Sequence, residues 1–161
     1  MHNASMGPEQ KEPKLVRWTE PPPMEPGAPR PVVCSNGRGL FCAYFISPSA
    51  APEGSVALLK FESVLQHRLG YPNDEALQGH PLYQFGLEHY DFFAVENSPL
   101  IDKIEKQNRC HSQHRPGIYA RFRHWVITFH DETLEVIALR SVVLRLTRSS
   151  PDKAVSEASA E

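Results

Sequence analysis

The predicted fold rests on one stretch of sequence, Arg121–Leu146, which is RFRHWVITFHDETLEVIALRSVVLRL. Apolar and polar residues alternate along it with a period of two, which is typical of β-strands with one buried face. A turn at Asp131-Glu132 would join two antiparallel strands and pair Trp125 with Ala138, Ile127 with Val136 and Phe129 with Leu134. Because Asp-Glu lacks the glycine or asparagine that a tight hairpin prefers, a longer loop or a bulge stays an alternative. A slip of one residue would reverse both faces.

The opposite face of this hairpin is polar near its turn. The same register places Thr128 across from Glu135 and His130 across from Thr133. We therefore expect a polar cluster at the turn end of the hairpin.

Composition and charge are those of an ordinary globular protein. The chain has 161 residues, of which 40% are hydrophobic and 22% charged, and this predicts a single core. A formal net charge of −2, with Lys and Arg scattered along the chain, predicts neither a nucleic-acid nor a membrane-surface partner. The three cysteines form no CxxC pair, and no apolar run approaches the roughly 20 residues of a bilayer-spanning helix. We therefore expect a cytoplasmic protein, rich in histidine, with eight such residues.

Three segments of different composition divide the chain. Residues 1–31 hold eight of the 15 prolines and predict a disordered, Pro-rich arm. Residues 32–146 predict a single α+β domain: a mainly antiparallel sheet of about five strands with one main helix on one face and a long structured loop. Residues 147–161 predict a disordered C-terminal tail.

The one helix that the sequence indicates starts at Ser98-Pro99, with serine as the N-cap and proline in the first turn. Its inner face is apolar at first and becomes polar at Asn108 and His111. If the helix crosses the sheet and ends over the hairpin turn, these side chains meet the hairpin cluster. The candidate polar site is therefore His80, Asn108, His111, His130 and Glu135, with His80 supplied by the loop at residues 70–90.

Two kinds of chemistry fit this candidate site. His111, His114 and His130 with Glu135 are ligand types for a transition metal, although an HxxH spacing is common by chance and HExxH is absent. An imidazole at His130 oriented by a carboxylate could also act in acid-base catalysis. The alternative for these histidines is a structural or surface role. No cofactor is indicated by the residues themselves.

Aromatic side chains gather in the same long loop. Tyr71, Tyr83, Phe85 and Tyr90 are candidates for lining a ligand pocket or a protein interface. The alternative is that they cover the open end of a small sheet.

Four strings carry a resemblance: PNDEA at residues 72–76, GHPL at 79–82, VENS at 95–98 and TFHDET at 128–133. Together they resemble a family of uncharacterised bacterial proteins with the patterns PNDEAxxGHPL, EVxNSxW and TFHDSTFE. The chain departs from those patterns at Leu100, Ile101, Glu132 and Leu134. The resemblance implies a bacterial cytoplasmic protein and carries over no catalytic residue.

These observations favour a non-enzymatic binding or accessory module that recognises a small ligand or a protein partner. The alternative is a small hydrolase, with or without assistance from a metal, that uses the histidine and glutamate cluster. A structural or inhibitory partner protein is a third class, which rests only on size.

Overall fold

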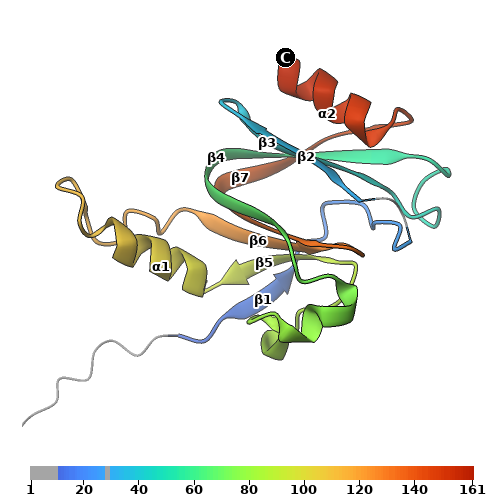
Figure 1. Cartoon of the computed structure of the whole chain (residues 1–161). Coiled ribbons are helices and arrows are strands. Elements are labelled where there is room, and N and C mark those ends of the chain that lie inside the picture. The colour runs from blue at the N-terminus through green and yellow to red at the C-terminus, as the bar shows by residue number, and fades with distance from the viewer. Residues whose placement is uncertain (1–10, 28–29) are drawn as a thin grey trace, which may run out of the picture.

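The computed structural model describes residues 11–27 and 30–161, and within them it has one antiparallel sheet in the order β1-β5-β6-β7-β4-β3-β2 (Figure 1). The strands are β1 (Lys14–Arg17), β2 (Val32–Asn36), β3 (Gly39–Phe45), β4 (Val56–Gly70), β5 (Phe92–Glu96), β6 (Arg123–Thr128) and β7 (Thr133–Thr147). The helices are α1 (Pro99–Asn108), α2 (Pro151–Ala160) and the 3-10 helices η1 (Asp74–Gly79) and η2 (Tyr83–Phe85). The α+β class and the antiparallel sheet agree with the prediction. The described residues form seven strands and two α-helices, however, not about five strands and one helix.

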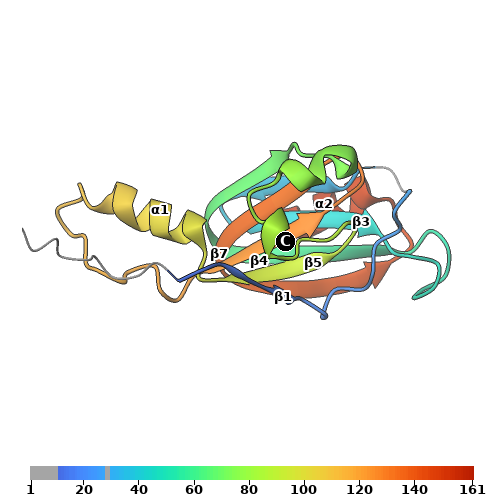
Figure 2. The same cartoon turned by 90° about the horizontal axis from the view of Figure 1, so that it is seen from below.

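Strands β4 and β7 are long enough to belong to two layers. They pair with each other from Val56–Thr147 to Gly70–Thr133, with register shifts at Leu58/Leu59 and Val64/Gln66. On their other sides, β3 pairs with the first half of β4 and β6 pairs with the first half of β7. Bulges bend strands, so the sheet folds over and encloses a core between its two halves (Figures 1 and 2).

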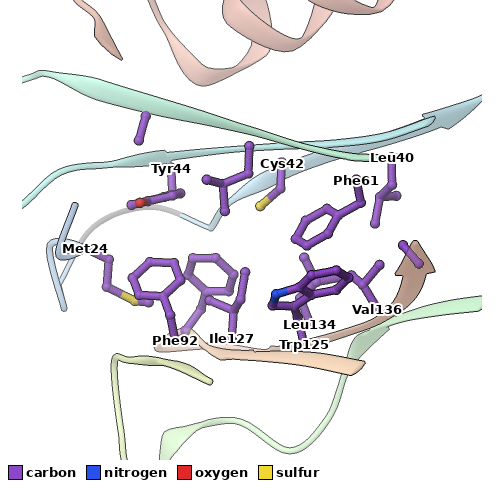
Figure 3. Packing of buried hydrophobic residues seen from close by; sticks show 14 of the residues in the cluster. Met24, Leu40, Cys42, Tyr44, Phe61, Phe92, Trp125, Ile127, Leu134 and Val136 are labelled. Atoms are coloured by element: carbon purple, nitrogen blue, oxygen red, sulfur yellow. The ribbon is translucent and has the colours of Figure 1, made fainter. Parts of the chain in front are cut away.

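The main core fills the space between these halves (Figure 3). Its buried side chains come from both layers and include Leu40, Cys42, Phe61, Phe92, Trp125, Ile127, Phe129, Leu134, Val136 and Ala138. All six apolar residues that the hairpin pattern placed on one face are in this cluster, which confirms that face.

The hairpin register differs from the prediction by two residues. Strands β6 and β7 pair Ile127 with Leu134 and Thr128 with Thr133, so Thr128 does not lie across from Glu135. The Phe129 N–H donates to the Glu132 carbonyl (2.9 Å), which places the turn at His130-Asp131. This turn is held from outside the hairpin, because the His130 carbonyl accepts the N–H of Asp74 (2.9 Å). A shift of two residues retains the faces.

Part of the segment predicted as a disordered arm is ordered. Strand β1 pairs with β5, and the Trp18 ring lies about 6 Å from the rings of Phe61 (6.0 Å) and Trp125 (6.0 Å). Met24 is buried and pairs with Ile46. A few apolar residues among the prolines are therefore enough to hold this segment against the core. Residues 1–10 and 28–29 of this Pro-rich N-terminal segment lie outside the described residues.

Helix α2 replaces the predicted C-terminal tail. Ser150 caps it by accepting the Lys153 N–H (3.3 Å). It packs on the outer face of the upper layer in Figure 1, where Ala154, Val155 and Ala158 are buried against a cluster that contains Phe41, Ala43, Val56 and Leu58. The prediction of a tail was wrong because the residues that α2 buries are mostly small and give little apolar signal.

Helix α1 does not pack on the sheet as predicted. It has no buried residue, and both views show it extending away from the sheet (Figures 1 and 2). Asn97 adopts a left-handed backbone conformation (φ 54°), which asparagine tolerates, at the point where the chain leaves β5. Among the described residues no helix has both the length and the apolar character needed to span a bilayer.

The long loop between β4 and β5 covers the outer face of β5 and β6. Leu77, Leu82 and Leu87 are buried there against Phe93, Val95 and Val126. The loop is thus structured, as predicted, and covers one outer face of the sheet.

Candidate functional site

A buried polar chain lies on this outer face, beneath the loop. The His80 side chain is 2% exposed, and its Nε2 contacts Oε1 of Glu135 at hydrogen-bonding distance. Because His80 Nδ1 accepts the Leu82 N–H (3.1 Å), its Nε2 carries the proton and donates to the carboxylate. Two of the five residues of the predicted polar site, His80 from the loop and Glu135 from β7, are therefore in contact.

The second oxygen of Glu135 faces another imidazole. His124 Nε2 lies 3.4 Å from Glu135 Oε2, a charge contact without the geometry of a well-formed hydrogen bond. On its other side, His124 Nδ1 lies 2.8 Å from the Ser98 hydroxyl. Ser98 also accepts the Ile101 N–H (3.2 Å) as the N-cap of α1. The chain His80–Glu135–His124–Ser98 therefore links the loop, two strands and the start of α1.

This environment keeps Glu135 ionised. Burial alone would raise its pKa, but the contacts with His124 and His80 outweigh burial and hold the pKa well below its usual range. A buried carboxylate that contacts two imidazoles and accepts a hydrogen bond from one of them is expensive to leave unpaired. The network therefore fixes the positions of both histidines and, through Ser98, the base of α1.

Ser98 and His124 also line a groove, at the point where the chain leaves β5 for α1 and returns to β6. It encloses about 540 Å³, within the range of sites for small ligands. Its wall includes apolar or aromatic residues from β1, β5, α1 and the returning loop, namely Val16, Ala94, Ile101, Tyr119 and Phe122. The groove is thus lined by both polar and apolar residues.

From here on, "the arm" means residues 99–123 and not the Pro-rich N-terminal segment. It comprises α1, the turns after it and the first residue of β6. Six of its residues are basic and exposed, and two are acidic, which gives the arm a formal charge of +4 in a chain of charge −2. The basic residues are Lys103, Lys106, Arg109, Arg115, Arg121 and Arg123. The structure describes every residue of the arm, and it shows none of the six in an ion pair or side-chain hydrogen bond to another described residue. The predicted scatter of positive charge is therefore wrong for this part of the surface.

The hairpin turn has its own polar cluster, separate from the buried chain. His130 lies 3.1 Å from Asp131 and 3.7 Å from Asp74, and these carboxylates raise its pKa. The Tyr90 hydroxyl donates to Asp74, which lowers the pKa of Asp74 and raises that of Tyr90. Since His130 is exposed, this cluster is a surface network that fastens the loop to the turn.

The histidines at the end of α1 do not join either cluster. His114 contacts Glu105 (3.3 Å) and Asn108 (3.3 Å), and His111 Nδ1 accepts the Gln113 N–H (3.0 Å). These contacts are internal to the arm, because α1 carries its C-terminal end away from the sheet (Figure 2). The predicted convergence of Asn108 and His111 with His130 is therefore wrong.

The predicted metal ligands His111, His114 and His130 are likewise not brought together. Across residues 11–27 and 30–161, no group of three or more His, Cys, Asp or Glu side chains is arranged to hold a metal ion. The loop aromatics also separate. Tyr71 and Tyr83 are 74% and 40% exposed, Phe85 packs beneath the loop, and Tyr90 bonds to Asp74.

Sequence reasoning did not place Ser98 and His124 in the site. Ser98 was recognised only as a helix cap. His124 lies near Glu135 because Glu135 pairs with Val126, and His124 is two residues before Val126 on the same face of β6. That diagonal neighbour could have been found from the correct hairpin register. Of the four strings of the resemblance, two supply His80 and Ser98 to the buried chain, and the other two supply Asp74 and His130 to the cluster at the hairpin turn.

No family model matches the chain, and no curated protein and no solved structure matches it at a significant level. The geometry of the site therefore carries the functional inference.

Proposed function

We propose that this protein is a non-enzymatic binding module that holds a segment of a protein partner in the groove at the base of the arm. The observation that carries this proposal is α1 itself, a capped helix of ten residues without a buried side chain. Leu100, Ile101 and Ile104 on this helix are only half-buried, and Ile118 in the returning turns is 41% exposed. Helices without a tertiary face are marginal in water unless something covers them.

The buried chain beneath the groove supports a positioning role. His80, Glu135 and His124 fix Ser98, and Ser98 fixes the first turn of α1. A rigid base holds the groove wall in one place while the rest of the arm stays accessible. Preorganised surfaces of this kind lose less entropy on binding.

Site-specific photo-crosslinking in cells tests this proposal. A photoreactive phenylalanine at Tyr119, in the groove wall, is expected to give one discrete adduct with a partner protein. The matched control carries the same group at Val142, which is 37% exposed on another part of the molecule. The partner identified from the adduct, once purified, should bind the intact chain and not a variant with a shortened arm. Equal adducts at both positions, or none at Tyr119, would contradict the proposal.

That variant can be designed from the sheet register. Since Val95 pairs with His124, the ends of β5 and β6 are adjacent, and Asn-Gly can connect Ser98 directly to Arg121. The replacement retains Ser98 and His124 and removes α1. We refer to it as the arm-replaced variant.

A second candidate function is ester hydrolysis, which the alignment of Ser98, His124 and Glu135 favours. The Ser98 oxygen would attack the carbonyl carbon, and its proton would pass to His124 Nδ1 and then to the leaving alcohol. Water would release the acyl group by the same route. It ranks second because Ser98 is 5% exposed and occupied as a helix cap, and the His124–Glu135 contact of 3.4 Å is long for an orienting hydrogen bond.

Turnover of p-nitrophenyl acetate and labelling by a fluorophosphonate distinguish the two functions. A hydrolase would lose both in Ser98→Asn, which retains a capping side chain, and would keep both in Ser112→Ala on the arm. If the wild-type chain shows neither turnover nor labelling above background, hydrolysis by Ser98 is excluded.

A further inference from the structure

From the charge and shape of the arm we infer the chemistry of the partner: an acidic segment of a second, different protein, with an apolar or aromatic residue that enters the groove. This inference rests on the proposed function and names what the groove would bind. Its starting point is the exposed cluster of six basic side chains in residues 99–123.

Positive charge of this density without carboxylate partners is costly to assemble and favours an anionic ligand. The two acids of the arm are too few to neutralise its six basic residues. Glu105 contacts His114 and the Gly117 N–H, and Asp102 lies in the groove wall with contacts of its own. Arg123 lines the groove, and Arg121 lies two residues before it. An acidic side chain on a bound segment would therefore meet positive charge at the edge of the groove.

The groove wall explains why the ligand needs an apolar residue as well. Tyr119 and Phe122 contact each other edge to face (5.7 Å between centroids) and share the wall with Ile101. Interfaces are commonly centred on such aromatic pockets with charged residues at the rim. A peptide can place one apolar side chain in the wall and carboxylates on the arginines at the same time.

A polynucleotide fits the same surface less well. Stacking of successive bases requires free aromatic faces, and the edge-to-face contact between Tyr119 and Phe122 occupies a face of one of these two rings. Glu96 and Asp102 also line the groove and would repel a continuous phosphate backbone. Discrete carboxylates can avoid these two residues, and a regularly charged chain cannot.

A second copy of this chain is also a poor match. Residues 69–98 hold five acids and no Lys or Arg, so they are the natural counterpart of the arm. Four of the five are already engaged within the molecule: Glu88 and Asp91 with Arg17, Glu96 with Lys14, and Asp74 with Tyr90. The partner is therefore a different protein.

Selection from a random library of twelve-residue peptides tests the inference. Peptides are selected on the full chain and depleted on the arm-replaced variant. Enriched peptides are expected to carry at least two Asp or Glu beside an apolar or aromatic residue. Their Kd should rise about tenfold or more between 50 and 500 mM NaCl, since charge contacts at an exposed rim are screened.

Charge reversal gives the matched comparison. Arg121→Glu with Arg123→Glu should weaken the selected peptides by about tenfold or more, whereas Lys153→Glu on α2, outside the arm, should leave the Kd within about twofold. A single-stranded twelve-nucleotide RNA and phosphatidylserine-containing vesicles are measured on the same proteins. Binding of either that is tighter than that of the peptides and is lost in the arm-replaced variant would overturn the inference of an acidic peptide.

Enrichment of neutral or basic peptides that need the arm would also overturn the inference but leave the proposed function standing. A photo-crosslink at Tyr119 to a partner that lacks an acidic segment would do the same. If no peptide prefers the full chain and Tyr119 gives no adduct, the proposed function fails with it.

Discussion

Helices α1 and α2 begin in the same way and end in opposite situations. Each has ten residues, a serine N-cap, proline next to the cap and an aspartate in the first turn. Each also places three apolar residues at the same spacing: Leu100, Ile101 and Ile104 in α1, and Ala154, Val155 and Ala158 in α2. Yet α2 is packed against the sheet and α1 has no buried residue.

The two helices differ in the strands to which the chain connects them. Helix α2 follows β7 at its end and can lie back across the sheet. Helix α1 connects two adjacent antiparallel strands, so the chain must go out along about 15 Å of helix and return to nearly its starting point. Side-chain size acts in the same direction, because two alanines let α2 approach the sheet closely. A capping signal therefore starts a helix, and the topology around it decides what the helix covers.

The largest expected difference comes from removing each helix. Truncation before Ser150 should lower the free energy of unfolding by about 4 kcal/mol or more, because the apolar outer face that includes Phe41 and Leu58 becomes exposed. The arm-replaced variant should lose less than about 1 kcal/mol. Urea unfolding followed by circular dichroism measures both. Losses of equal size would break the comparison.

The next largest loss of stability is expected from a change in the buried chain His80–Glu135–His124–Ser98. Glu135→Gln should cost about 3 kcal/mol at pH 7, since it removes the charge that two buried imidazoles contact. The folded-state pKa of Glu135 is lowered, so its stabilisation is present above the ordinary carboxyl pKa and is lost as pH falls toward the folded pKa. The gap in stability between wild type and variant should therefore shrink as the pH is lowered from about 4.5.

Thermal unfolding of both proteins from pH 7 to pH 3 tests this sign. Val155→Ala on α2 is the control, because it removes only apolar contacts and should keep a constant gap over the same range. A Glu135→Gln gap that stays constant would show that the carboxylate is not held by its charge.

A smaller difference is expected between the free-energy costs of removing the two N-cap serines. Ser150→Ala should cost about 1 kcal/mol, the usual value of an N-cap. Ser98→Ala should cost about 2 kcal/mol, because His124 Nδ1 loses its partner in a buried setting as well. Ser98→Asn should recover part of the cap. Identical losses for the two alanine variants in urea unfolding would argue against the His124 contact.

The smallest effect on stability is expected at Ile104, a half-buried residue of α1. Ile104→Ala should change the free energy of unfolding by less than about 0.5 kcal/mol, against about 1.5 kcal/mol for Val155→Ala, because Ile104 leaves no cavity in a packed core. The same Ile104 variant should still weaken the peptide complex if the helix face is covered by the partner. A large loss of stability in Ile104→Ala would show that α1 is packed in solution.

Local patterns in the sequence predicted local features well. Alternation identified the buried face of the hairpin, and Ser98-Pro99 identified the start of α1. The turn position was missed because it depends on a contact with Asp74, far away in the chain. Strand β1 was missed because proline composition dominated the signal of its few apolar residues.

The site was predicted only in part, for similar reasons. His80 and Glu135 were in the candidate set, and the loop does bring them together. Asn108 and His111 were included on the assumption that α1 crosses the sheet, whereas α1 extends away from it (Figure 2). Ser98 and His124 could not be paired from sequence alone, because their contact depends on how α1 leaves β5.

The continuous pairing of β4 with β7 also bears on how this chain folds. The two strands are far apart in sequence, and η1, η2, β5, α1 and β6 all lie between them. Their ladder forms only after a long loop has closed, so refolding should be slow for a chain of this length. Loop closure depends only weakly on loop length, with about 0.6 kcal/mol for each doubling. The arm lies inside that loop, so residues can be added to it or removed from it with little effect on the refolding rate.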